Sequence, residues 1–491
     1  MRTYWIKHLR MASLLVLATQ LAACGSYPVN PKLDAYNPDQ GYRFDQLDQG
    51  GNSDELFVVV TFSGGGTRAA ALAYGILEAL RDTKIDFHDN RIRLLDEVDV
   101  ISSISGGSFT AAYYALKRDA TFTEFPDKFL YKRIQSDLTS EALSPGNWFK
   151  LAGSSYGRSD LAADYYNESV FDGATYADIV KQRRRPFVIL NATDMSSGRQ
   201  FPFIQDQFDL LCADLSQLNV ARAAASSSAF PGLLTPLTFK NYANACKYSQ
   251  PEWVTRALSD HKSRVNVART ARAENRVSYN DTSSETDPRS RDYIHLIDGG
   301  VSDNIGLRST ITALTSPNFS WSLMSRLNNE QIDKILVIVV NAATDPDTQR
   351  DKKTKVPGTI DTVTAAATVP LGNYSIDTIK ALNDSVREYT MDTKLLSQCK
   401  AMAAAKGTQC ELDIPEPHQV ELYPAQVAFE YIESDSERDW FKNLPTNFQL
   451  PADTIDKLRD IGRKLLSQDD EFQRFLLSVN GCMPIDGETC S

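Results

Sequence analysis

The chain is poor in histidine, in net positive charge and in long apolar runs. It has 491 residues but only five histidines, and its formal net charge is −11. An acidic chain lacks the basic face that nucleic-acid phosphates require, so we expect no nucleic-acid partner. The amino-terminal apolar stretch, residues 11–21, is too short to span a bilayer. Hydrophobic residues still make up 42% of the chain, which is enough for a sizeable buried core.

Cysteine is also scarce, and its spacing argues against a metal site. The chain has seven cysteines, and none has zinc-ligand spacing with histidine, so we expect neither a metal nor a cofactor. Setting Cys24 aside leaves six, an even number that suggests disulfides in an exported chain. The spacing favours neighbouring pairs: Cys212–Cys246, Cys399–Cys410 and Cys482–Cys490.

The first 25 residues resemble a bacterial lipoprotein signal peptide. Basic residues precede the apolar stretch, and Leu-Ala-Ala-Cys-Gly follows at 21–25. The resemblance implies removal of residues 1–23 and attachment of acyl chains to Cys24. An ordinary secretory signal with a chance cysteine is the alternative. Because Gly25 is not aspartate, we expect a lipid anchor in the outer membrane of the bacterial cell envelope. Residues 24–53 are rich in Pro, Asn, Asp and Gly, which predicts a tether.

A glycine-rich turn follows the first apolar strand pattern. Residues 56–62 form a continuous apolar run, typical of a strand buried on both faces. Ser-Gly-Gly-Gly-Thr-Arg follows at 63–68, and a helix is expected over about 69–81. Such a turn presents free N–H groups to an anion. Since the Gly-Lys-Ser/Thr ending of a phosphate loop is absent, an oxyanion hole formed by Gly64, Gly65 and Gly66 is favoured over a nucleotide site.

Ser105 is the candidate nucleophile. The apolar run 98–104 leads into Ser105 and two glycines, and the pattern then becomes helical. A strand, sharp turn and helix in this order expose the serine hydroxyl above the edge of a sheet. Position 103 is serine where the usual motif has glycine, but a small residue still permits the turn. The N–H of Gly106 is expected to add to the oxyanion hole.

Asp298 is the candidate general base. It ends a strand pattern over 293–297 and precedes two glycines. The carboxyl ends of parallel strands meet at one edge of a sheet, so Asp298 is expected to meet Ser105 there. No histidine has a convincing motif, and His295, three residues earlier on the same strand, faces the opposite side. We therefore expect a Ser105–Asp298 dyad in which the aspartate takes the serine proton.

Strand and helix patterns alternate up to residue 343, which predicts an α/β fold with a mainly parallel sheet. The expected catalytic domain covers residues 54–345 and includes a polar insertion over about 252–292. Residues 346–491 form a mostly helical C-terminal extension, interrupted by an extended segment over 420–432, and no chemistry is assigned to it.

Taken in order, these motifs resemble the patatin-like phospholipase family. The glycine loop at 63–68, the serine elbow at 103–107 and Asp-Gly-Gly at 298–300 match its motifs, and the blocks at 191–194 and 225–231 also look like family blocks. The resemblance implies a three-layer patatin-like fold and ester hydrolysis by Ser105 and Asp298. Arg68 is expected to orient the glycine loop, and a direct contact with a phosphate is the alternative.

We expect a lipid acyl hydrolase that cleaves carboxylic ester bonds of membrane phospholipids or lysophospholipids. Two alternatives remain. One is an esterase for neutral or short-chain esters, and the other is a catalytically silent, lipid-binding envelope lipoprotein.

Overall fold

The computed structural model describes residues 28–259 (without 49, 54, 88 and 89), 267–280, 291–308, 332–345 and 420–484. Between 345 and 420 it describes residues 397–406 and a few shorter stretches and single positions, and beyond 484 it describes Cys490. The predicted signal peptide, Cys24 and Cys410 lie outside the described residues.

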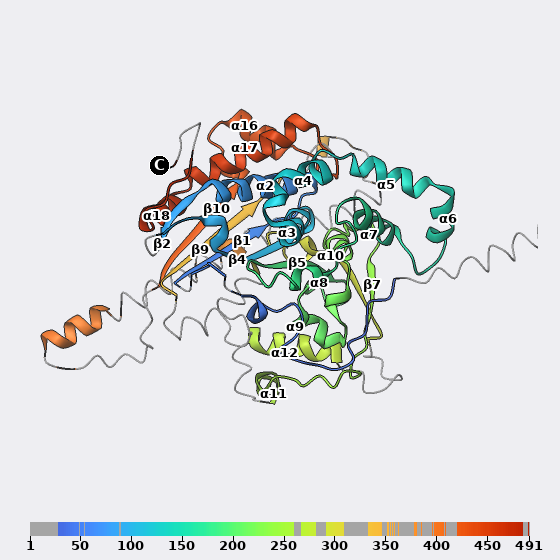
Figure 1. The fold of residues 1–491 in the computed structure, drawn as a ribbon, viewed down its shortest axis with the longest axis horizontal. Coiled ribbons are helices and arrows are strands. Elements are labelled where there is room, and N and C mark those ends of the chain that lie inside the picture. The colour runs from blue at the N-terminus through green and yellow to red at the C-terminus, as the bar shows by residue number, and fades with distance from the viewer. Residues whose placement is uncertain are drawn as a thin grey trace, which may run out of the picture.

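One eight-stranded sheet forms the centre of the molecule (Figure 1). Its strands, in spatial order, are β10 (Glu421–Ala428), β9 (Lys334–Asn341), β1 (Leu56–Phe62), β4 (Val98–Ile104), β5 (Phe187–Asp194), β8 (Tyr293–Asp298) and β7 (Leu237–Lys240), while β6 (Gln200–Pro202) pairs with β5. Neighbours from β10 to β5 are parallel, whereas β8 is antiparallel to both β5 and β7. The predicted α/β fold with a mainly parallel sheet is confirmed. A separate hairpin pairs β2 (Lys84–Phe87) with β3 (Asn90–Arg93).

Strand β1 shows why the sheet is covered on both faces. All seven of its residues are buried, as its unbroken apolar run predicts. Alternate side chains point to opposite faces. On one face Phe62 lies against Gly107 of α3 (Ser105–Lys117). On the other, Phe57 packs against Phe44, with ring centroids 6.2 Å apart. The sheet is therefore the middle layer of three.

Helices supply both outer layers. One face carries α3 together with α2 (Thr67–Asp82), α10 (Val220–Ser227) and α17 (Ala452–Gln468). Figure 1 shows α9 (Gln205–Phe208), α11 (Glu252–Ser259) and α12 (Val267–Asn280) at the opposite end of the molecule from α17. The last two belong to the predicted polar insertion. Helices α5 (Ile134–Leu143) and α6 (Pro145–Leu151) extend outward on the α3 side, and α7 (Arg158–Ser169) packs against α10.

The C-terminal region shares the central sheet and its core. Strand β10 forms the edge of the sheet beside β9, and the helices α16 (Asp435–Lys442), α17 and α18 (Asp470–Ser478) follow it. Helices α2 and α17 approach so closely that a Cβ on Gly75 would lie 2.4 Å from the carbonyl oxygen of Arg459. Glycine at position 75 is what permits this approach. The expected domain boundary at residue 345 therefore does not separate two hydrophobic cores.

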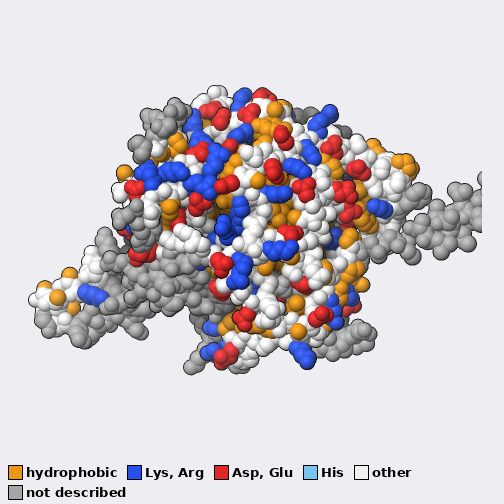
Figure 2. Space-filling model, viewed as in Figure 1, with side chains coloured by type: hydrophobic (Ala, Val, Ile, Leu, Met, Phe, Trp, Pro, Cys, Tyr) orange, Lys and Arg blue, Asp and Glu red, His pale blue; other side chains and the backbone are white. Residues whose placement is uncertain are grey.

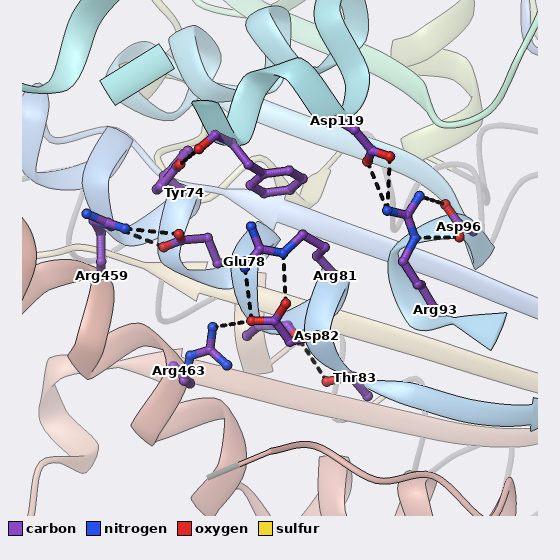
Figure 3. Close-up of polar contacts among 12 residues, drawn as sticks. Tyr74, Glu78, Arg81, Asp82, Thr83, Arg93, Asp96, Asp119, Arg459 and Arg463 are labelled. Atoms are coloured by element: carbon purple, nitrogen blue, oxygen red, sulfur yellow. Dashed lines mark hydrogen bonds and ion pairs between the residues drawn. The ribbon is translucent and has the colours of Figure 1, made fainter. Parts of the chain in front are cut away.

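Ion pairs tie α17 to α2 along this contact (Figure 3). Arg459 donates to Glu78 from Nη2 at 2.9 Å and from Nε at 3.1 Å, and Arg463 lies 2.6 Å from Asp82. These side chains are partly exposed, so each pair contributes about 1 kcal/mol or less, and the apolar seam beneath them holds the helices together. In Figure 2, Lys and Arg side chains on this face are interspersed with Asp and Glu.

The amino-terminal segment from residue 28 is packed onto the fold, so the expected tether over 24–53 is wrong for residues 28–48. Asn30 exchanges two hydrogen bonds with the backbone of Lys240, at 2.6 and 3.1 Å. Arg43 is buried and lies 2.6 Å from Asp209. Tyr42 bonds the backbone of Val188 within the core. Its many polar residues suggested a solvated linker, but their polar groups are satisfied by the fold.

Two disulfides join the cysteines that sequence spacing paired: Cys212 with Cys246 and Cys482 with Cys490. Cys399 is also disulfide-bonded, and its predicted partner, Cys410, lies outside the described residues. No helix in the described part of the chain has the length and apolarity needed to cross a membrane. Across the same residues, no group of His, Cys, Asp or Glu side chains is arranged for metal binding.

Candidate active site

Ser105 stands at the junction of β4 and α3 in a strained backbone conformation. Its φ is +48°, a left-handed value that is unusual for a residue with a side chain. The strand ends at Ile104, and the helix begins at Ser105 itself. A Cβ on Gly106 would lie 2.0 Å from the carbonyl oxygen of Gly66, so only glycine fits after the serine. This is the geometry that the sequence predicted for a nucleophile.

Serine at position 103 is accommodated within β4. Its side chain is buried, and its hydroxyl donates to the carbonyl oxygen of Ile189 on β5 at 3.2 Å. It also accepts the hydroxyl of Ser108 at 3.2 Å. The departure from the usual glycine thus adds a link between the strand before the nucleophile and the helix after it.

Asp298 contacts the nucleophile directly. The hydroxyl of Ser105 donates to Oδ2 of Asp298 at 2.8 Å, and the N–H of Gly300 donates to Oδ1 at 2.7 Å. Burial raises the pKa of Asp298 to about 6, and the hydrogen bonds from Gly300 and Ser105 oppose that rise. The carboxylate is therefore ionised at neutral pH and is a stronger base than an exposed aspartate.

Asp298 reaches Ser105 by a different route from the one that the sequence predicted. Strand β8 runs antiparallel to β5, so its carboxyl end does not share an edge with those of the parallel strands. Instead, β5 continues beyond the end of β4, where Asn191 pairs with Ile104. Strand β8 returns along that overhang and ends with Asp298 opposite Ala192. The two residues meet because β8 stops at the level of the elbow.

The glycine loop lies against the start of α3, and its three glycines differ in role. The N–H of Gly64 donates to the carbonyl oxygen of Asn304 at 3.0 Å, so it is not free to hold an oxyanion. This corrects the expectation for Gly64. The N–H groups of Gly65, Gly66 and Gly106 have no hydrogen-bond acceptor among the described residues. Gly65 and Gly66 have φ values of +140° and +61°, which favour glycine.

Arg68 is a buried cation that joins the glycine loop to the C-terminal region. Its guanidinium donates to the carbonyl oxygens of Ala342 at 2.9 Å and Leu444 at 2.7 Å, and to the hydroxyl of Thr446 at 3.0 Å. Burial lowers its pKa to about 10. None of these three contacts is to Gly64, Gly65 or Gly66, so the expectation that Arg68 orients the glycine loop stays a prediction.

The segment 444–447 forms the outer wall of this loop, which sequence reasoning missed. The carbonyl oxygen of Asn447 accepts the N–H of Thr67 at 2.8 Å, and a Cβ on Gly66 would lie 2.2 Å from it. No local pattern in residues 444–447 signals this role, because it depends on a contact between segments nearly 400 residues apart.

Ser227 holds the backbone of Ser105 in place. Its Oγ accepts the N–H of Ser105 at 2.8 Å and donates to the carbonyl oxygen of Asn191 at 2.6 Å. The hydroxyl of Ser108 lies 2.9 Å away. The run of three serines at 226–228 in a small-residue helix was the signal that could have identified this position.

His295 is the one histidine in the described part of the chain, and it lies away from the site. His295 is exposed on the face of β8 opposite to Asp298, and its Nδ1 lies 3.1 Å from the hydroxyl of Thr238. His88, His261 and His418 lie outside the described residues.

Known proteins resemble this chain to different degrees. A family model described as patatin-like phospholipase matches residues 60–311. No curated protein sequence matched the chain. Human GIVD cytosolic phospholipase A2 aligns with a TM-score of 0.42 and 12% identity, over 87% of this chain and 60% of that one. VipD from Legionella pneumophila aligns with a TM-score of 0.29 and 10% identity, over 94% and 73%. The chain thus spans about 60% of the length of the human protein it matches.

Proposed function

Because the chain belongs to the patatin-like phospholipase family, we propose that it is a serine acyl-ester hydrolase that cleaves carboxylic ester bonds of phospholipids or lysophospholipids. The observation that carries the proposal is the 2.8 Å hydrogen bond from the hydroxyl of Ser105 to a buried carboxylate of Asp298. A buried base of raised pKa beside a strained serine is the arrangement that activates a nucleophile.

In the first half-reaction, Oγ of Ser105 forms a bond to the ester carbonyl carbon while its proton passes to Asp298. The negative charge that develops on the carbonyl oxygen is held by the free N–H groups of Gly65, Gly66 and Gly106. The C–O bond to the leaving alcohol then breaks, and the alcohol takes the proton from Asp298. The products are an acyl-serine and the released glycerol-containing alcohol.

In the second half-reaction, water gives a proton to Asp298 and attacks the acyl carbon. The bond to Oγ breaks, Oγ regains the proton, and the fatty acid leaves. Asp298 thus serves as base and acid in turn. The N–H of Gly300 keeps the carboxylate in one orientation through both steps.

A fluorophosphonate probe on purified protein tests the nucleophile. We expect labelling of the wild-type protein and none of Ser105→Ala. Labelled Ser105→Ala would assign the reactive serine elsewhere, and no labelling of folded wild type would refute the enzyme. Incubation with defined phospholipids, with products identified by mass, then tests the substrate. Release of fatty acid and lysophospholipid supports the proposal, whereas hydrolysis of short-chain esters alone would favour the esterase.

We also propose that the protein is anchored by lipid on Cys24 in the bacterial envelope, at the outer membrane. The support is the basic start, short apolar stretch and Leu-Ala-Ala-Cys sequence. Incorporation of labelled fatty acid in cells should be lost in Cys24→Ser. Equal incorporation in that variant would contradict the anchor.

A further inference from the structure

Asp298 lies where β8 ends and a single helical turn, Gly299–Val301, begins. The main chain leaves the sheet at this residue, so any shift of the turn would move the carboxylate. Two contacts fix its peptide groups. The N–H of Asp298 donates to the carbonyl oxygen of Ala229 at 3.0 Å, and its carbonyl oxygen accepts the hydroxyl of Thr193 at 2.9 Å. The second contact depends on a side chain, that of Thr193.

The hydroxyl of Thr193 contacts both ends of this turn. It lies 3.3 Å from the carbonyl oxygen of Gly299, and it accepts the N–H of Ser302 at 3.2 Å. The hydroxyl oxygens of Thr193 and Ser302 are 2.9 Å apart, and both residues are buried, so solvent does not compete for these bonds. Between the two ends, the N–H of Gly300 donates to Oδ1 of Asp298. A turn held at both ends keeps this N–H, and with it the carboxylate, in one place.

The same strand, β5, also contacts the nucleophile. Alternate residues of a strand face one side, so Asn191 and Thr193 lie on the same face of β5. Nδ2 of Asn191 donates to the carbonyl oxygen of Ser103 at 3.1 Å. The carbonyl oxygen of Asn191 accepts the hydroxyl of Ser227, which itself accepts the N–H of Ser105. Two residues of one strand, about 7 Å apart, thus hold the elbow and the turn of the base.

We propose that Thr193 is a positioning residue for the hydrolytic reaction, because its hydroxyl holds the turn that keeps Asp298 in hydrogen-bond contact with Ser105. The inference rests on the proposed ester hydrolysis. Thr193 contacts neither of the two reacting side chains through its own hydroxyl, and it acts through the backbone of Asp298. A misplaced base slows proton transfer from the serine and leaves the ester-binding surface unchanged, so Thr193 affects kcat rather than KM.

Three variants test this role with p-nitrophenyl butyrate as substrate. Thr193→Val keeps the shape of the side chain and removes the hydroxyl. It should lower kcat and the rate of fluorophosphonate labelling by about 10–100-fold, with KM within about twofold. Thr193→Ser restores the hydroxyl and should recover most of the rate. Thr238→Val is the matched control, because the hydroxyl of Thr238 bonds His295 on the same strand β8, away from the turn. Its rates should stay within about twofold of the wild type.

A double-mutant cycle separates positioning from a general loosening of the fold. The base is absent in an Asp298→Asn background, so adding Thr193→Val there should not reduce the residual labelling rate further. Equal fold-losses in the two backgrounds would overturn the inference. Wild-type kcat in Thr193→Val, or no recovery in Thr193→Ser, would do the same. If Thr193→Val does not fold, Thr193→Ala takes its place, since it also lacks the hydroxyl and sets no methyl group against the carbonyl oxygens.

Hydrogen exchange tests the turn without any hydrolysis. Exchange at the amide of Gly300, resolved by fragmentation in a mass spectrometer, should become about tenfold faster or more in Thr193→Val. It should stay near the wild-type rate in Thr193→Ser and Thr238→Val. Unchanged exchange in Thr193→Val would contradict the proposal whatever the hydrolytic activity. Folded wild-type protein that hydrolyses no ester would refute the proposed function instead, and the exchange rates would still decide whether Thr193 holds the turn.

Discussion

The hydroxyl of Ser105 and Oδ2 of Asp298 lie 2.8 Å apart, across 193 residues of sequence. The other carboxylate oxygen is held by the N–H of Gly300 at 2.7 Å. In a serine–histidine–aspartate triad, a third side chain orients the base. In the proposed dyad, the backbone of the turn that begins at Gly299 orients the carboxylate in place of a third side chain.

Asp298→Asn should lower the activity and raise the stability of the protein. Loss of the base is expected to lower kcat by about 10²–10⁴-fold. The native pKa of Asp298, about 6, exceeds its ordinary value of 3.8, so its favourable contribution to stability is present below pH 3.8 and lost as the pH rises through 6. Replacing the buried carboxylate should therefore raise the free energy of unfolding at pH 8 by up to about 3 kcal/mol, since (6 − 3.8) × 1.36 is about 3.

The measurements for this variant are hydrolysis rates and urea unfolding at pH 8 and pH 4. The stability gain should shrink at pH 4. Wild-type activity in Asp298→Asn would show that another group acts as the base.

The rate should depend on pH through the same carboxylate. Only ionised Asp298 can accept the serine proton, so kcat/KM is expected to rise with pH and to reach a plateau above about pH 6. Below that pH, kcat/KM should fall about tenfold for each pH unit. A pH series with a soluble ester measures this limb. A midpoint near 4 would show that burial does not raise the pKa of the working base, and a midpoint lost in Asp298→Asn would assign the limb to this residue.

Gly106→Ala should damage the site through the backbone. The new methyl group would lie 2.0 Å from the carbonyl oxygen of Gly66, which cannot move without shifting the glycine loop. We expect a loss of about 1–3 kcal/mol in unfolding free energy and little labelling by fluorophosphonate. Gly146→Ala in α6 is the matched control, since nothing lies within 4 Å of its Cβ position. Wild-type labelling in Gly106→Ala would contradict the close contact.

Ser227→Ala should loosen the elbow without removing a reacting atom. The variant leaves the N–H of Ser105 without its acceptor, which costs about 1–3 kcal/mol in a buried site. The rate of probe labelling should fall, because the strained turn at Ser105 loses its support. Ser226→Ala serves for comparison, as its hydroxyl bonds only its own helix at Arg222. Equal labelling rates in the two variants would deny Ser227 a positioning role.

Removal of the Cys212–Cys246 disulfide should lower stability. The bond closes a loop of 34 residues, and its loss in a double alanine variant is expected to cost about 3–4 kcal/mol. The carbonyl oxygens of these two cysteines also accept the N–H groups of Leu33 and Tyr36. Proteolysis within residues 30–40 should accelerate in the variant, alongside a lower melting temperature. Unchanged melting and cleavage would show that packing alone holds this region.

Local sequence signals predicted the elements that carry the site. The apolar runs over 56–62 and 98–104 are strands with those bounds, because each is buried on both faces and is limited by turn residues. Ser105 and Asp298 were also identifiable, since each ends such a strand beside glycine. The mostly helical character expected of the C-terminal extension is confirmed by α16, α17 and α18.

The features that could not be predicted depend on contacts between distant segments. Strand β8 runs antiparallel to β5, and this direction follows from the pairing of the two strands. The side chains of β8 would alternate in the same way in a parallel strand, so the sequence pattern does not reveal the direction. The N–H of Gly64 donates to the carbonyl oxygen of Asn304, a residue 240 positions later in the chain (304 − 64). Residues 28–48 are rich in polar side chains. Such a composition is found both in solvated linkers and in segments whose side chains form hydrogen bonds with the rest of the protein, so it does not distinguish them.

If Cys24 carries the proposed lipid, the docked amino-terminal segment limits the distance between the folded protein and the bilayer. Asn30 is hydrogen-bonded to Lys240, and Cys24 lies only six residues earlier in the sequence (30 − 24). An extended chain covers at most about 3.5 Å per residue, or about 20 Å in all. A lipid on Cys24 would therefore act as a short pivot. The protein would present the face around Lys240 to the membrane and sample few orientations, so its reach would be limited to lipids in its immediate surroundings.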